Sequence, residues 1–192
     1  MERGEDALRG LREGRLGGIK KLDLKGLGLT SVPEEVWRAE ATLEILDLGD
    51  NRIASLPPDM HRLTKLRILF LSGNPLGEVP RALGGCPSLS MIGMRRCGIS
   101  NVPKESIPPN LRWLILTENK LESLPKEIGG ATKLQKLMLA GNLLTSLPES
   151  LAACRELELI RLSSNRLREV PPFLLSLPKL SWLAMSSNPL LG

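Results

Sequence analysis

Few residues of this chain have the chemistry or the spacing expected of a catalytic or metal site. The only histidine, His61, stands in the segment PPDMHRL, and no cysteine or serine nucleophile is placed to use it. The cysteines, Cys86, Cys97 and Cys154, lie far apart and lack the Cys-x-x-Cys spacing of metal and redox sites. No Gly-rich phosphate loop, His-Glu-x-x-His motif or clustered carboxylate pair occurs either. The sequence therefore predicts no catalytic residue, no metal site and no cofactor, and we expect that the chain is not an enzyme.

The composition indicates one domain with an aliphatic core. Hydrophobic residues make up 42% of the 192 residues, but there are only 3 Trp and 2 Phe and no Tyr, so leucine must supply most of the core. The formal charge of +5 is spread along the chain, and no basic block is interleaved with aromatic residues. This distribution argues against a nucleic-acid partner.

The N-terminal segment and the cysteines indicate where the protein is expected to act. Residues 1–18 are charged throughout and lack the apolar run of a secretory signal or a membrane span. The 3 cysteines cannot all pair within one molecule, and reduced thiols in a reducing compartment are the simplest account. We therefore expect a cytoplasmic protein with no membrane partner.

One pattern recurs through most of the chain: leucine, two variable residues, leucine, one variable residue, leucine, two variable residues, asparagine, one variable residue and leucine. Its copies begin at Ile19, Leu43, Leu66, Leu89, Leu111, Leu134, Leu157 and Leu180. Successive copies start 22 to 24 residues apart, and each copy but the last continues through a Val-Pro or Leu-Pro pair. A leucine-rich composition alone does not produce so many copies in register.

These residues resemble the leucine-rich repeat family, in its intracellular branch with units of 23 residues and Leu-Pro pairs. The resemblance implies an α/β solenoid, a right-handed coil curved into a horseshoe arc, with a parallel sheet on the concave face and short helices or 3₁₀ turns on the convex face. It also implies a fold used mostly to bind other proteins. The residues predict a similar shape independently, because Leu137 and Leu139 alternate with Lys136 and Met138, which is the period of a short strand with one buried face.

An asparagine follows most of the predicted strands, where the chain must turn sharply. The column contains Asn51, Asn74, Asn119, Asn142, Asn165 and Asn188. We expect each amide to donate to and accept from the backbone of adjacent coils, since buried turn groups would otherwise lack partners. Cys97 takes this position in the fourth repeat, where a small thiol fits and donates weakly. Leu27 takes it in the first repeat, which predicts an apolar contact with an N-terminal cap.

The proline of each Val-Pro or Leu-Pro pair predicts the start of a short helix or 3₁₀ turn on the convex face, since its missing N–H costs nothing there. The fourth repeat differs because Pro108 and Pro109 prevent a helix from continuing. We expect extended backbone and a local irregularity over residues 104–110. Cys86 and Cys154 occupy a column that otherwise holds leucine or alanine, and should be small buried hydrophobes.

We divide the chain into an N-terminal capping segment, residues 1–18, and eight repeats, residues 19–192, of which the last is truncated. Leu8, Leu11 and Leu16 stand among Arg and Glu and predict one short amphipathic helix over residues 5–16 that covers the first coil. The last repeat has no polar capping element, which predicts that it contacts a following domain or another subunit.

The third and fifth residues of each repeat alternate with the buried leucines and are expected to face the inside of the arc. These positions and one flanking arginine give the predicted partner-binding residues: Ile45, Asp47, Ile68, Phe70, Met91, Arg95, Trp113, Ile115, Met138, Leu159, Arg161 and Trp182. Soluble proteins rarely leave such an apolar stripe uncovered, and Trp, Phe and Met are enriched at interface centres. The alternative is that β-propensity alone favours Ile, Trp and Phe at strand positions. The arginines either form a polar rim that pairs with acidic groups of a partner, or are solvated turn residues.

We therefore expect a non-catalytic module that binds a partner protein or peptide on its concave face. The alternative is the N-terminal regulatory region of a larger signalling enzyme. The segments LRWLILTENKLESLP and LPKLSWLAMSSNPL look similar to the repeat region that precedes the catalytic domain in repeat-containing protein kinases, although these 192 residues contain no kinase motif. Nucleic-acid binding would need a basic concave face, and the apolar residues argue against it.

Overall fold

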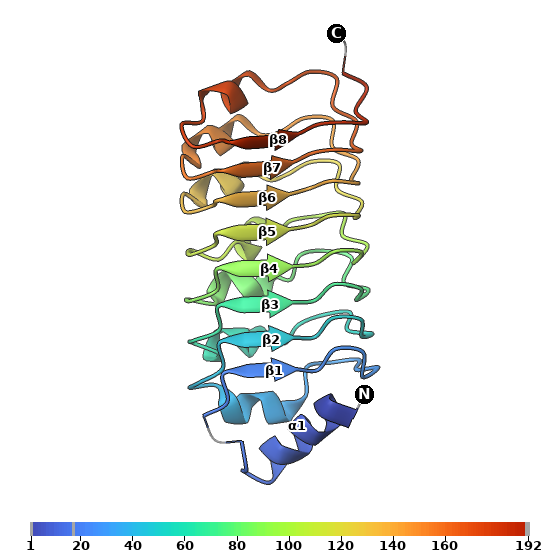
Figure 1. The fold of residues 1–192 in the computed structure, drawn as a ribbon, viewed down its shortest axis with the longest axis vertical. Coiled ribbons are helices and arrows are strands. Elements are labelled where there is room, and N and C mark those ends of the chain that lie inside the picture. Colours follow the sequence, from blue (N-terminus) through green and yellow to red (C-terminus); the bar gives the residue numbers. More distant parts are fainter. Residues whose placement is uncertain (1, 17, 191–192) are drawn as a thin grey trace.

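The computed structural model describes residues 2–16 and 18–190, which form a stack of coils (Figure 1). Each coil contributes one strand to a single 8-stranded parallel sheet in the order β1-β2-β3-β4-β5-β6-β7-β8. Short 3₁₀ helices lie on the other side of the coils, and helix α1 lies at the N-terminal end of the stack. The predicted solenoid is confirmed. Met1, Gly17, Leu191 and Gly192 belong to the predicted cap and last repeat, and they lie outside the described residues.

Each strand is short, and its central residue is a leucine or isoleucine that points into the core. The strands are β1 (Lys21–Asp23), β2 (Ile45–Asp47), β3 (Ile68–Phe70), β4 (Met91–Gly93), β5 (Trp113–Ile115), β6 (Lys136–Met138), β7 (Leu159–Arg161) and β8 (Trp182–Ala184). The central residue is buried from β1 to β7 and half-buried in β8. Strands spaced about 4.8 Å apart make a ribbon roughly 35 Å long.

A 3₁₀ helix returns the chain along the outer side of each of the first seven coils. These are η1 (Glu34–Ala39), η2 (Pro58–Arg62), η3 (Arg81–Gly85), η4 (Lys104–Ser106), η5 (Lys126–Gly130), η6 (Glu149–Ala153) and η7 (Pro172–Ser176). Each begins directly after the proline of a Val-Pro or Leu-Pro pair, such as Pro57 with φ −66° and ψ 150°. The ring fixes φ and removes an N–H that would have no partner, so the predicted start position is confirmed.

The outer helix of the fourth repeat, η4, has only 3 residues. Our prediction of extended backbone throughout residues 104–110 is wrong at Lys104–Ser106. There the N–H and the hydroxyl of Ser106 both donate to the Pro103 carbonyl, at 2.9 Å and 2.6 Å, and close one turn. Ile107 is then extended, with φ −90° and ψ 110°, because it precedes Pro108. The predicted irregularity of the outer face is therefore present, in a shorter segment.

Helix α1 (Glu2–Arg12) packs against the first coil. It ends earlier than the predicted span of residues 5–16, and Leu16 lies in the turn that follows. Leu11 is buried, and its carbonyl accepts a hydrogen bond from Arg38 of η1 at 3.2 Å. The Leu27 side chain lies so close to α1 that a Cβ added at Gly4 would be 2.8 Å from it. The apolar residue in the asparagine column of the first repeat therefore contacts the helix, as predicted.

The core is a column of aliphatic side chains that runs the length of the stack. Leucines and isoleucines at the repeated positions are almost fully buried from Leu22 to Leu167. Cys86 and Cys154 are completely buried beside them, which confirms the prediction that they behave as small hydrophobes. Each coil contributes only a few side chains, so it buries its leucines against its neighbours rather than against itself.

The asparagines point inward and join consecutive coils. Asn142 donates through Nδ2 to the carbonyls of Leu116 and Leu139, each at 2.9 Å, and accepts from the N–H of Leu121 at 3.0 Å. Two of these partners belong to the preceding coil, so one side chain satisfies backbone groups of both turns. Cys97 makes a partial substitute, since its Sγ donates to the Leu71 carbonyl at 3.2 Å.

Replacing Asn119 with alanine should lower the free energy of unfolding by about 1 to 3 kcal/mol, because buried backbone groups lose their partners. Asn119 accepts from the N–H groups of Cys97 and Ile99 at 2.9 and 3.0 Å, and donates to the Met94 carbonyl at 2.8 Å. Urea denaturation followed by circular dichroism measures the change.

The matched control is Asn101→Ala. The Asn101 side chain is exposed and makes one long hydrogen bond, 3.4 Å, to Glu78. Its removal should change the unfolding free energy by less than about 0.5 kcal/mol. Equal effects of the two substitutions would remove our explanation of the asparagine column.

Candidate functional site

The open face of the sheet, which we call the concave face, is formed by the residues that flank each buried strand centre. Neighbouring strands pair in one register, so these residues stand in two rows across the sheet. The first row is Lys21, Ile45, Ile68, Met91, Trp113, Lys136, Leu159 and Trp182. The second row is Asp23, Asp47, Phe70, Gly93, Ile115, Met138, Arg161 and Ala184.

All twelve predicted partner-binding residues lie on this face or at its edge, and none of them is buried in the core. Most are half-buried because each side chain leans on its row neighbours, whereas Arg95, Arg161 and Trp182 are exposed. Trp182 stands on the last strand and keeps 59% of its surface accessible. The strand register inferred from the leucine pattern is therefore correct.

The apolar residues gather on the central strands, β3 to β6. Gly93 is the one position of this region without a side chain. The Phe70 ring lies over Gly93, so close that a Cβ atom added there would be only 3.0 Å from Phe70 Cδ1. The ring thus extends across β4, whose Gly93 pairs with Ile115 of β5. Together with Met138, these residues form a continuous apolar surface along the second row.

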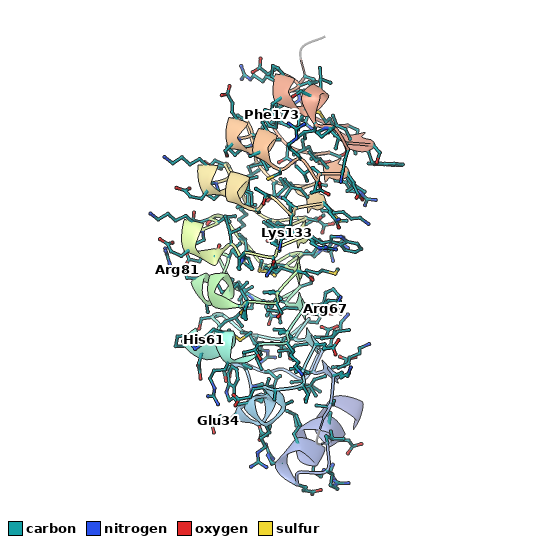
Figure 2. All side chains as sticks on the ribbon, turned by 90° about the vertical axis from the view of Figure 1, so that its left-hand side faces the viewer. Glu34, His61, Arg67, Arg81, Lys133 and Phe173 are labelled. Carbon is teal, nitrogen blue, oxygen red and sulfur yellow. The ribbon has the colours of Figure 1, made fainter. Side chains whose placement is uncertain are left out.

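A hollow of about 280 Å³ opens beside the first row, at the edge of the sheet where the strands begin. Its apolar lining is Ile68, Met91 and Trp113, and its polar lining is Arg67, Ser90, Arg112 and Gln135. Figure 2 faces this edge and shows Arg67 on it, whereas His61 and Arg81 lie on the outer turns. The hollow therefore combines an apolar floor with cationic side chains.

Lys136 stands over the Trp113 ring, with Nζ 3.9 Å from the ring centroid. The two residues are direct partners in the β5–β6 pairing, so the sheet register brings the ammonium to the ring face. A cation at this distance is attracted by the negative face of the indole. The ammonium of Lys136 therefore holds one face of the Trp113 ring. Trp113 also lines the hollow.

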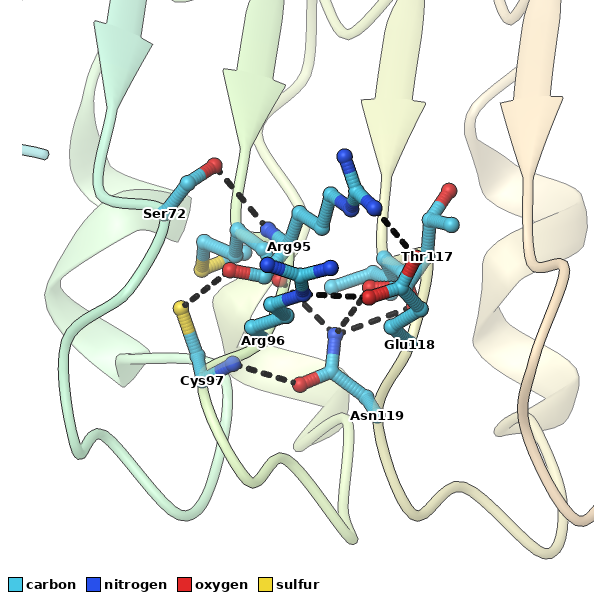
Figure 3. Close-up of polar contacts among 9 residues, drawn as sticks. Ser72, Arg95, Arg96, Cys97, Thr117, Glu118 and Asn119 are labelled. Atoms are coloured by element: carbon cyan, nitrogen blue, oxygen red, sulfur yellow. Dashed lines mark hydrogen bonds and ion pairs between the residues drawn. The ribbon is translucent and has the colours of Figure 1, made fainter. Parts of the chain in front are cut away.

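At the opposite edge of the concave face, Arg95 and Arg96 converge on a single carboxylate, Glu118 (Figure 3). Arg96 and Glu118 have left-handed backbone, with φ 55° and 56°, at a repeat position that glycine fills in Gly73 and Gly141. The hydrogen bonds from Arg95 and then Arg96 hold the pKa of the Glu118 carboxyl below its usual value. Two cations share one anion, so this cluster keeps a positive charge.

One predicted residue, Asp47, has a structural contact that weakens its case as a binding residue. The carboxylate of Asp47 accepts a hydrogen bond from the Gly49 N–H at 2.8 Å and so stabilises its own turn. Ile45 precedes Asp47 on β2 and pairs directly with Ile68 of β3, so it extends the apolar first row by one strand. Asp47 alone is therefore at the margin of the candidate site.

Arg67, Arg112 and Glu118 were not predicted from the sequence, and Lys136 was placed on the concave face but not among the binding residues. Arg67 and Arg112 occupy the second position of their repeats, directly before the strand, and only the third and fifth positions were assigned to the concave face. The signal was available, because a residue one step before the strand lies at the edge of the same face. Glu118 and its pairing with two arginines of the preceding coil depend on the spatial stacking of the repeats.

A family model described as leucine rich repeat matches residues 17–76, 41–99, 109–167 and 132–190. The chain belongs to the leucine-rich repeat family. It is 33% identical over 113 residues to protein flightless-1 homolog of Caenorhabditis elegans, an alignment that covers 56% of this chain and 9% of that protein. It is 32% identical over 119 residues to the probable inactive serine/threonine-protein kinase roco10 of Dictyostelium discoideum, covering 57% of this chain and 4% of that protein. The leucine-rich repeats here thus span less than a tenth of either relative.

Among solved structures, a leucine-rich repeat protein of Leptospira interrogans superposes with a TM-score of 0.86 at 32% identity. The superposition covers 96% of this chain and 46% of that protein.

The residues with reactive side chains do not come together in these leucine-rich repeats. His61 lies on η2, exposed, with Nδ1 3.2 Å from the Pro58 carbonyl oxygen. Within residues 2–16 and 18–190, no three His, Cys, Asp or Glu side chains gather as a metal site would require. Over the same residues, every helix is too short or too polar to cross a membrane.

Burial raises the pKa of the Cys86 and Cys154 thiols to about 11. At pH 8 both should react with a disulfide reagent such as dithionitrobenzoate at least roughly a hundredfold more slowly in the folded protein than in guanidinium, since the thiolate is the nucleophile. Their contribution to stability is complete below the pKa of an unfolded thiol, about 8.5, and is lost as the pH rises through the folded pKa.

The control for this labelling experiment is Ser55→Cys, which places a thiol at an exposed position. That variant should react at once in the folded state. Immediate reaction of the native Cys86 would show that its coil does not pack as described.

Proposed function

We propose that this leucine-rich repeat chain is a non-catalytic module that binds a partner protein or peptide on its concave face. The observation that carries the proposal is the continuous apolar surface of β3 to β6, formed by Phe70, Met91, Trp113, Ile115 and Met138. Apolar patches of this kind on soluble proteins usually mark interaction sites, and aromatic residues and Met are enriched at the centres of interfaces. The family's general role in protein interaction agrees with it.

The distribution of residues favours this function over a simple preference of strands for apolar residues. Preference for the strand conformation would apply equally to all eight strands. The outer strands instead carry Lys21 and Asp23 on β1, Asp47 on β2 and Arg161 on β7, whereas β3 to β6 carry one charged residue in the two rows, Lys136. Apolar residues are concentrated on neighbouring strands in the middle of the face, as a binding surface would require.

A second candidate is the regulatory region of a larger signalling enzyme, such as a protein kinase. It is supported by the similarity to the inactive kinase roco10, of which the chain would correspond to only 4%. In both candidates we propose that the leucine-rich repeats bind and do not catalyse. We also propose a cytoplasmic location, which the free cysteines favour. Sequencing the full reading frame and finding a kinase domain after the repeats would favour the second candidate.

Replacing Trp113 with alanine should weaken partner binding by about 2 kcal/mol, roughly thirtyfold in Kd, because a central aromatic anchor is lost. The melting temperature should change little, since the side chain lies outside the core. Binders are selected from a displayed library of protein fragments, and their Kd values are measured by isothermal titration calorimetry.

The matched control is Phe173→Ala, on the outer side of the seventh coil. Phe173 lines a hollow of about 320 Å³ between the outer turns, which is an alternative surface for a partner. Binding that survives Trp113→Ala but is lost in Phe173→Ala would place the partner on the outer side and refute the proposal.

A further inference from the structure

We propose that the occupant of the concave face is an acidic segment of a partner protein. One apolar side chain of the segment enters the hollow formed by Ile68, Met91 and Trp113, and neighbouring carboxylates pair with Arg67 and Arg112. This inference rests on the proposed function and names the chemistry of its partner. It depends on the charge of the central strands, on the arginines at the hollow and on the size of the hollow.

The central part of the concave face is strongly basic. Residues 67–73, 90–96, 112–118 and 135–141 span β3 to β6 and their edges. They contain five cationic residues and one carboxylate, a surplus of four positive charges. The cationic residues are Arg67, Arg95, Arg96, Arg112 and Lys136, and the carboxylate is Glu118. The same positions of the seventh and eighth coils, residues 158–164 and 181–187, carry no net charge. A partner with acidic groups is therefore favoured over the middle of the face.

The carboxylates of the neighbouring second coil offset this charge only in part, because lysines of the first coil pair with two of them. Glu44 lies 3.0 Å from Lys20, and Asp50 lies 3.1 Å from Lys25. Arg67 is 3.8 Å from Glu44, a longer separation than the Lys20 pair. An acidic partner therefore meets the basic surface from β3 onward, while Glu44 and Asp50 disfavour its extension over β2.

The arginines at the two edges of the face differ in how many partners they already have. Arg95 and Arg96 are both bound to Glu118. Arg112 is exposed and forms no ion pair with any side chain described for residues 4–16 and 18–190. A guanidinium offers five N–H donors in a planar fork that fits a carboxylate. Of the two arginines that line the hollow, Arg112 is thus the better placed to bind a carboxylate of a partner, since Arg67 already lies 3.8 Å from Glu44.

The hollow has the dimensions of an anchor site for a side chain. Its volume of about 280 Å³ lies just below the range of roughly 300 to 1,000 Å³ typical of pockets for small molecules. Its floor is apolar and its rim is cationic, so an apolar side chain next to a carboxylate satisfies both.

The same features favour a peptide over a nucleic acid. Single strands bind to basic grooves through successive stacking of their bases on exposed aromatic rings. On β3 to β6 the rings are Phe70, which lies over Gly93, and Trp113, which already holds Lys136 on one face. The strand between them, β4, carries Met91 and Gly93, which offer no ring for a base to stack on, so this surface favours apolar side chains over bases.

The test uses the whole 192-residue chain and a phage-displayed library of random twelve-residue peptides. We expect enrichment of peptides in which a large apolar residue stands within two positions of Asp or Glu. The best synthetic peptide should lose at least about tenfold in affinity towards Arg112→Gln. It should bind Arg168→Gln as tightly as wild type, because Arg168 is exposed and distant from the hollow lining.

The other outcomes separate this inference from the proposed function. Neutral or basic peptides that bind wild type but not Trp113→Ala would overturn the inference and leave the proposed function standing. Peptides that bind Trp113→Ala as tightly as wild type, or a library that yields no binder, would count against both. A twelve-nucleotide oligouridylate that binds more tightly than every peptide, with the same loss in Arg112→Gln, would replace the acidic segment by a nucleic acid.

Discussion

The whole structure depends on how the inward turn after each strand satisfies its backbone hydrogen bonds. Such a turn leaves carbonyl and N–H groups in an apolar core, where an unpaired group costs about 1 to 3 kcal/mol. Asn142 and its equivalents pair groups of their own coil and of the preceding coil with one side chain. The amide therefore fixes the stacking of coils as well as the turn, and every strand position follows from that stacking.

Regular stacking turns a periodic sequence into two straight rows of side chains. Because neighbouring strands pair at identical repeat positions, Ile68, Met91 and Trp113 become neighbours although they are more than 20 residues apart in the chain. The leucines that build the core leave the residues between them free to vary without cost to the fold. A binding surface and a scaffold are thus encoded in alternate residues of the same strands.

The concave face combines two properties of protein interfaces, an apolar centre and a charged rim. Its central strands expose apolar side chains, and the edges of those strands carry arginines. Apolar area provides affinity, while charge at the rim directs the approach of a partner and selects among partners. The pairing of Arg95 and Arg96 with Glu118 makes one edge less available than the other, so the edge at Arg112 dominates the expected recognition.

The sequence alone determined the solenoid, the sheet, the register and the direction of each strand residue, because leucine spacing and strand alternation are local and repeat in every coil. It also located Phe70 and Trp113 on the open face. It did not determine the 3₁₀ turn at Lys104–Ser106, which precedes the residues restricted by the prolines and is closed by the N–H and hydroxyl of Ser106. The sequence also did not predict that the Phe70 ring covers Gly93, that two arginines pair with Glu118, or that arginines line a hollow beside Trp113. These features join residues of different coils, and their distances exist only after the coils have stacked.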